Sequence, residues 1–317
     1  MARLARRVRL DGAARPAALE KVQSLTLPGS RLDTGDRVQN PLLIAALLGT
    51  MPLLDATFSG PASAQTVPVE QASDWRLVFE DNFDGDALDQ GKWVRCYWWD
   101  QNGCTNLGNS ELQWYLPENV SVSDGSLRLT ARPEVVVGGS ATYDYSSGMV
   151  TTGHAKHDDP DHSKFEFQYG YAEIRTRLPE GQGLWPAFWM LPSTQKSLPE
   201  IDVMEVLGQE PDVLHFNFHY RDDAGQRRKD DSSISTPDLS DDWHVYAVDW
   251  SPERIIWYFD GVEQWRYDDA SHVPNEPMYL ILNLAVGGNW PGDPDETTHF
   301  PAELTVDYVR VWQREAQ

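Results

Sequence analysis

The sequence predicts an all-β protein, an antiparallel β-sandwich of the jelly-roll type. From about residue 74 onward, short runs alternate apolar and polar residues, the period of a half-buried strand. Gly, Pro, Asp and Asn separate these runs, and hardly any segment shows the helical period. Many short strands with such turns are typical of two packed antiparallel sheets. The sequence shows no internal repeat and no linker to a second domain.

The expected strands share this alternation and follow one another at short intervals. In chain order they cover residues 75–79, 120–122, 127–131, 171–178, 245–250, 255–259, 279–286 and 304–312. The turn signals between them fall at residues 123–125, 179–181, 260–261 and 289–294.

Residues 1–64 form a basic N-terminal region, distinct from the domain expected over residues 65–317. An apolar run over residues 41–54, followed by Ala62-Ser63-Ala64, is typical of a secretory signal and its cleavage site. We therefore expect this region to be removed and the domain to be secreted. The alternative is that the apolar run forms a buried hairpin. No stretch reaches the ~18 to 20 uninterrupted apolar residues of a membrane span.

The charge of the expected domain restricts its partners. The whole chain carries −23, and residues 1–64 hold 8 Lys and Arg against 5 Asp and Glu, so residues 65–317 carry −26. An anionic body of this kind repels nucleic acids, anionic membranes and sulfated or uronic polymers. We expect a monomer with a neutral partner, no nucleic acid and no membrane association after processing.

The two cysteines of the chain, Cys96 and Cys104, are near enough in sequence to close a short loop. In an exported protein this spacing favours a disulfide, with buried free thiols as the alternative.

Three carboxylates lie in an apolar run at residues 198–206 that is typical of a strand. Strand side chains alternate between faces, so Glu200 and Asp202 point the same way, whereas Glu205 falls on the opposite face. One inserted residue, most simply Met204 in a β-bulge, returns Glu205 to the face of the other two. Bulges often re-aim side chains beside active sites.

With the bulge, Glu200 and Glu205 have Cα atoms roughly 13 Å apart at about 3.3 Å per residue. Their side chains can lean together to the separation of about 5 to 5.5 Å that a retaining glycosidase needs. Asp202 can hydrogen-bond Glu200 and keep the two Glu pKa values apart, so that one is ionised and one protonated. The alternatives are a solvated acidic face or a calcium site.

Aromatic segments flank the carboxylates. Residues 183–191 and 287–292 contain Trp185, Trp189 and Trp290. Aromatic faces stack on the apolar faces of sugar rings, so these segments favour a carbohydrate site.

These residues resemble glycoside hydrolase family 16, whose signature Glu-x-Asp-x-x-Glu is matched by Glu200, Asp202 and Glu205. The form with the extra residue is similar to the laminarinase-like branch. The resemblance covers about 240 residues, carried by segments 77–85, 109–115, 169–175, 183–191, 290–292 and 306–311.

The resemblance implies a concanavalin-like β-jelly roll with a cleft on its concave face, no organic cofactor, and endo-cleavage of a β-linked glucan or galactan with retention. It implies that Glu200 is the nucleophile, Glu205 the acid/base and Asp202 the assisting carboxylate.

The resemblance also implies substrate-binding residues. Trp185 and Trp189 would form the floor of the cleft. The alternative for Trp189 is a position in the core. Asn109 and Glu111 would bind sugar hydroxyls, His219 would lie beside Glu205, and Trp290 would cap one end.

A structural calcium ion on the convex side is implied for many family members. Here its ligands would map near Glu80, to the Gly125 carbonyl and to Asp307, which offer the oxygen donors calcium prefers.

The substrate implied is a laminarin-type β-1,3-glucan, with mixed β-1,3/1,4-glucan as a second substrate. The alternatives are a β-agarase, a glucan transglycosylase on the same site, or a jelly-roll protein that binds glucan without cleaving it.

Overall fold

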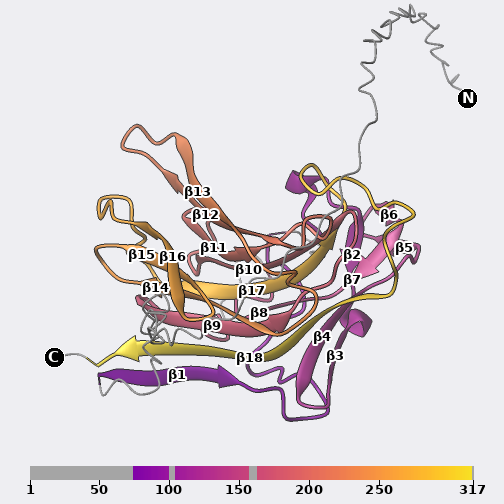
Figure 1. Cartoon of the computed structure of the whole chain (residues 1–317), viewed down its shortest axis with the longest axis horizontal. Helices are drawn as coiled ribbons and strands as arrows, with labels where there is room; N and C mark the ends of the chain where they lie inside the picture. Colours follow the sequence, from indigo (N-terminus) through magenta and orange to yellow (C-terminus); the bar gives the residue numbers. More distant parts are fainter. Residues whose placement is uncertain (1–73, 100–103, 157–162, 316–317) are drawn as a thin grey trace, which may run out of the picture. The chain divides into compact units, whose positions relative to one another are not determined.

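The computed structural model describes residues 74–99, 104–156 and 163–315. Within them lie 18 strands and two short 3-10 helices, η2 (Leu107–Asn109) and η3 (Pro117–Asn119), so the predicted all-β class is confirmed. Two large antiparallel sheets lie one over the other (Figure 1). None of the described helices is long and apolar enough to cross a membrane. The predicted secretory signal falls outside the described residues.

The larger sheet has eight strands, and its order is β16 (Val262–Tyr267), β15 (Ile255–Phe259), β14 (His244–Trp250), β9 (Gly170–Arg177), β18 (Ala302–Arg314), β4 (Ser126–Ala131) and β3 (Val120–Ser123), with β1 (Trp75–Asp81) also paired to β18. The long strand β18 pairs with β4 through its first residues and with β1 through its last, so it ties the start and the end of the domain together.

The six-stranded sheet has the order β13 (Arg227–Ser235), β12 (Val213–Arg221), β11 (Glu200–Glu205), β10 (Leu184–Pro192), β17 (Met278–Val286) and β8 (Met149–Thr151). Two small pairs complete the described strands, namely β2 (Gln113–Tyr115) parallel to β7 (Tyr145–Ser147), and β5 (Val136–Gly138) antiparallel to β6 (Ala141–Tyr143).

All eight strands expected from alternation are present, with ends that differ by one or two residues at most positions. Strand β13 has no such signal, because its sequence RRKDDSSIS is polar on both faces. It forms the edge of the six-stranded sheet, where charged residues are tolerated and discourage pairing with another chain.

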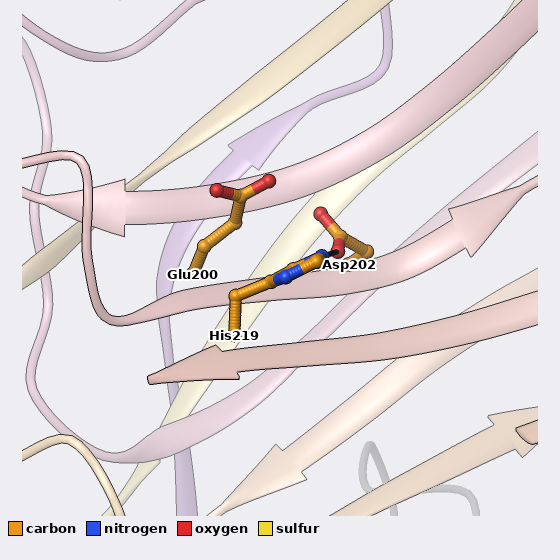
Figure 2. Close-up of side chains that lie close together, drawn as sticks. All are labelled: Glu200, Asp202 and His219. Atoms are coloured by element: carbon orange, nitrogen blue, oxygen red, sulfur yellow. Dashed lines mark ion pairs between the residues drawn. The ribbon is translucent and has the colours of Figure 1, made fainter. Parts of the chain in front are cut away.

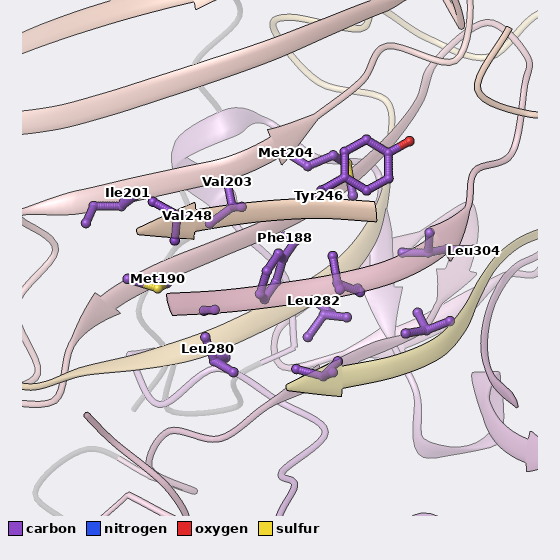
Figure 3. Packing of buried hydrophobic residues seen from close by; sticks show 14 of the residues in the cluster. Phe188, Met190, Ile201, Val203, Met204, Tyr246, Val248, Leu280, Leu282 and Leu304 are labelled. Atoms are coloured by element: carbon purple, nitrogen blue, oxygen red, sulfur yellow. The ribbon is translucent and has the colours of Figure 1, made fainter. Parts of the chain in front are cut away.

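The core fills the space between the two large sheets. Figure 3 shows Phe188, Val203 and Met204 of the six-stranded sheet packed toward Tyr246 and Val248 of the eight-stranded sheet. All five are fully buried. Residues at the neighbouring positions of β10 and β11 point to the other face, which leaves that face free for a site.

A second apolar cluster covers part of this outer face of the six-stranded sheet. Tyr97 and Trp98 pack there on Trp189 and Tyr279, and they belong to a loop closed by a disulfide between Cys96 and Cys104. The predicted disulfide is therefore present. It holds an aromatic segment against the sheet at a point where the sheet would otherwise meet solvent.

Replacing Phe188 tests the core between the sheets. We expect Phe188→Ala to lower the free energy of unfolding by roughly 3 to 5 kcal/mol, because it removes a fully buried ring and leaves a cavity. Chemical denaturation of both proteins measures the difference. Val262→Ala, at a position 37% exposed, should change stability by no more than about 0.5 kcal/mol. Equal losses in the two variants would contradict this location of the core.

Candidate active site

A β-bulge in β11 places the three predicted carboxylates. Toward β10, Met204 pairs with Phe188 and Asp202 with Trp189, so Val203 is the extra residue. Toward β12, Asp202 pairs with Asn217 and Glu205 with His215, which leaves Val203 and Met204 together against one residue. The predicted bulge is confirmed, although the residue inserted relative to β10 is Val203 and not Met204.

Packing explains why the bulge forms here. Val203 and Met204 are both fully buried in the core between the sheets (Figure 3). The indole Nε1 of Trp257, on β15 of the opposite sheet, donates a hydrogen bond to the Asp202 carbonyl at 2.9 Å. Two consecutive apolar side chains thus face the core, and Glu205 returns to the outer face.

The carboxylates have different partners on that face. Glu200 and Asp202 lie side by side on β11, with the His219 ring of β12 beside Asp202 (Figure 2). The distance from His219 Nε2 to Asp202 Oδ2 is 3.4 Å. Ligand atoms of these three residues lie within 4.8 Å of one another. Glu205 instead accepts hydrogen bonds from Trp185 Nε1, at 3.0 Å, and from Asn217 Nδ2.

Burial raises the pKa of all three carboxyl groups above their ordinary values. The charge of Asp202 adds to the rise at Glu200, and the charge of Glu205 adds to the rise at Asp202. At Glu205, the hydrogen bonds from Asn217 and Trp185 oppose the rise. Burial and the mutual repulsion of the carboxylates therefore both favour the binding of protons at this site.

The pKa directions do not assign separate roles to the two Glu residues, because the pKa of each is raised. Hydrogen bonds from Asn217 and Trp185 favour the carboxylate of Glu205, whereas the charge of Asp202 favours the neutral form of Glu200. The roles of the two Glu residues therefore rest on the family resemblance and not on these resting pKa directions.

His219 is near enough for its charge to affect the pKa of Glu205, but its direct contact is with Asp202. Strands β11 and β12 are antiparallel, so His219 lies opposite Glu200, and His215 lies opposite Glu205. His219 contacts Asp202, and Asn217 is the β12 residue that contacts Glu205.

A cavity of about 610 Å³ lies over the carboxylates, and every predicted cleft residue lines it. Trp185 is half-buried, and Trp189 is nearly buried with its Nε1 bonded to Asn283 Oδ1 at 2.7 Å. Trp189 therefore belongs to the apolar cluster and to the cleft wall at once. Trp290 is 39% exposed at one end, with its ring edge-to-face on Trp185 at 5.3 Å.

Asn109 and Glu111 line the same cavity. Glu111 accepts hydrogen bonds from Asn109 Nδ2 at 3.0 Å and from Gln113 Nε2 at 2.7 Å, and burial raises its pKa to about 7 despite them. Gly288, at φ +121°, lets this segment lie against the end of β17, because a Cβ there would approach the Asn109 carbonyl to 2.9 Å. The glycine therefore positions two predicted binding residues.

The predicted calcium ligands have other partners. Glu80 Oε1 lies 3.0 Å from Arg310 Nε, and Asp307 Oδ2 lies 2.6 Å from Arg175 Nη1. Among the described residues no group of three His, Cys, Asp or Glu forms around either carboxylate. Gly125 lies in the turn between β3 and β4. These side chains do not fit the predicted ion, and calcium stays a prediction that the contacts do not support.

Asn217 was missed from the sequence, and the directions of Trp98 and Trp99 could not be predicted from it. Asn217 had a signal, because the alternation of His215, Asn217 and His219 places all three on one strand face. Trp98 and Trp99 line the cavity from the disulfide loop, and their sequence neighbourhood offered no strand pattern that fixes their direction.

Comparisons with known proteins agree with this geometry. The sequence model of "Glycosyl hydrolases family 16" matches residues 113–310. A "Beta-glucanase" of Rhodothermus marinus is 39% identical over 77% of this chain and 87% of its own length. "Endo-1,3-1,4-beta-glycanase EglC" of Rhizobium meliloti is 37% identical over 75% of this chain, which spans about half (52%) of that protein.

A solved structure agrees as well. The laminarinase catalytic domain of Thermotoga maritima MSB8 superimposes with a TM-score of 0.67 and 35% identity, over 77% of this chain and 100% of that one. The predicted jelly roll is confirmed by this likeness. The family model covers more than half of the chain, and the signature carboxylates lie together in a cleft. The chain therefore belongs to glycoside hydrolase family 16, in its laminarinase-like branch.

Proposed function

We propose that this protein is a secreted endo-glycosidase that hydrolyses β-1,3-glucan, and mixed β-1,3/1,4-glucan as a second substrate, with retention of configuration. The observation that carries the proposal is the set of three carboxylates on one face of β11, with Glu200 half-buried and the other two buried, inside a cavity walled by tryptophans. The names of the similar laminarinase and of the similar 1,3-1,4-glycanase support these two substrates.

In the proposed reaction, a glucan chain lies along the cavity. Glu205 gives its proton to the glycosidic oxygen as that bond breaks, and a Glu200 oxygen bonds to the anomeric carbon. Glu205, now ionised, takes a proton from water, and the water oxygen displaces Glu200 from the anomeric carbon. The product keeps its β configuration, and Glu205 regains its proton.

The reaction needs Glu200 ionised and Glu205 neutral at its start. We place a proton on Asp202 during the attack, because a neutral Asp202 leaves the negative charge on Glu200. Substrate that fills the cavity removes water from around Glu205, which favours its neutral form. The charges of His219 and Arg227 favour the carboxylate of Glu200.

Two further features support the proposal. The domain carries −26 outside residues 1–64, which favours a neutral polymer over a sulfated one. A disulfide is typical of proteins in oxidising compartments, so the bond between Cys96 and Cys104 supports secretion. No observation favours agarase or transglycosylase activity over hydrolysis of β-1,3-glucan.

Reducing-sugar release from laminarin, barley β-glucan, lichenan, agarose and κ-carrageenan tests the substrate. We expect release from laminarin first, slower release from the mixed-linkage glucans, and none from κ-carrageenan. Binding of laminarin without any release would favour a glucan-binding protein. Transfer products in place of new reducing ends would favour a transglycosylase.

Substitution of the two Glu residues tests their roles. We expect Glu200→Ala and Glu205→Gln each to lower kcat on laminarin by at least about 10³-fold, because each removes a group that bonds to a reacting atom. Both variants should still bind laminarin in affinity electrophoresis. Glu263→Gln, at an exposed position on β16 in the other sheet, serves as the control and should keep full activity. Substantial turnover by Glu200→Ala would exclude it as nucleophile.

The pH dependence of kcat/KM tests the environment of Glu205. A general acid is active below its pKa, so activity is expected to fall as pH rises through the raised pKa of Glu205. The Asn217 amide stabilises the carboxylate, so Asn217→Ala should raise that pKa further and move the alkaline limb to higher pH. Trp185→Phe removes the other donor and should move the limb in the same direction. A limb that stays in place, or moves to lower pH, would contradict this assignment.

A further inference from the structure

The segment Tyr97-Trp98-Trp99 forms an aromatic platform in the wall of the cavity. The Tyr97 and Trp99 rings are stacked, with their centroids 4.0 Å apart and an angle of 18° between their planes. The Trp98 ring packs edge-to-face against Trp99. Trp98 Nε1 donates to the Tyr279 hydroxyl at 2.7 Å, which ties the segment to β17. Tyr97 and Trp98 are buried, whereas Trp99 is half-buried and lines the cavity.

This platform lies toward the Glu200 end of the catalytic row. The ring centroids of Trp99 and Trp189 are 6.3 Å apart, and Trp189 pairs with Asp202 in the sheet. Trp98 is bonded to Tyr279, which pairs with Leu191 beyond Trp189 in β10.

The opposite end of the cavity is defined by Trp290. Its ring lies 5.3 Å from Trp185, whose Nε1 is bonded to Glu205. The same ring lies 5.0 Å from His215, which is opposite Glu205 in the sheet. The half-buried Trp99 and the exposed Trp290 therefore lie on opposite sides of the carboxylate row.

We propose that Trp99 is a substrate-binding residue on the glycone side of the cleft, where it stacks on a sugar ring beyond the one attacked by Glu200. The assignment rests on the proposed function. Glu205 protonates the departing part of the chain, so the departing part lies on the Glu205 side. The sugars that stay attached to Glu200 then extend toward Trp99.

The disulfide is part of this subsite. A sugar ring gains most from an aromatic face that is already fixed in place, because little conformational entropy is lost on binding. Tyr97 supports one face of Trp99, and the bond between Cys96 and Cys104 closes the loop that carries both rings. Opening the loop should therefore weaken sugar binding although neither cysteine contacts the sugar.

Cleavage of laminarihexaose labelled at its reducing end tests the side of the cleft. Loss of a glycone subsite lets the chain shift toward the aglycone side, so Trp99→Ala should give longer labelled products than wild type. Trp290→Ala should shift the pattern in the opposite direction, toward shorter labelled products. Trp99→Phe keeps a ring and should retain the wild-type pattern. Trp75→Ala, in β1 of the other sheet, is a control that should also retain it.

Binding measured in the Glu205→Gln background separates the subsite from the reaction. Calorimetry with laminarihexaose should show affinity lowered roughly 2- to 10-fold by Trp99→Ala, the effect of losing one stacking contact. The Cys96→Ser, Cys104→Ser double variant should lose affinity and shift products in the same sense as Trp99→Ala. Unchanged affinity and an unchanged product pattern in Trp99→Ala would overturn the inference, even with laminarin hydrolysis intact. Failure of wild type both to bind and to cleave laminarin would instead refute the proposed function, and the inference with it.

Discussion

The site depends on one extra residue in strand β11. Without the bulge at Val203, the strict alternation of a strand would direct Glu205 into the core between the sheets. With it, Val203 and Met204 both pack in the core, and Glu205 joins Glu200 and Asp202 on the outer face. The hydrogen bond from Trp257 to the Asp202 carbonyl links the bulge to the opposite sheet. The same bulge therefore fixes both the packing of the core and the position of Glu205 in the site.

The neighbouring strands then give chemically similar carboxylates different surroundings. Strand β10 supplies the Trp185 indole and β12 supplies the Asn217 amide, both to Glu205. Glu200 lies near the charges of His219 and Arg227, while Asp202 is almost completely buried between the two Glu residues. Burial makes protons bind more tightly at all three groups, and the donors decide where they reside. The substrate completes this arrangement by excluding water.

Much of this was predictable from the sequence, and the remainder has physical reasons. Alternation at residues such as 127–131 indicated the strands, and the position of Glu205 indicated a bulge. Strand β13 was missed because its residues are polar on both faces. The direct contact of His219 with Asp202 was not predicted, because the register between β11 and β12 depends on contacts far apart in sequence. The directions of Trp98 and Trp99 depend on packing against β10 and β17, and no local pattern encodes that.

The stereochemistry of the first product tests the central claim, that the bulge brings Glu200 and Glu205 together as nucleophile and acid/base. Proton NMR during early hydrolysis of laminarin resolves the two anomers of the new reducing end before they interconvert. The account predicts that the β anomer accumulates first, since two displacements at one carbon restore its configuration. Initial accumulation of the α anomer would mean a single displacement by water, and would contradict the proposed covalent role of Glu200.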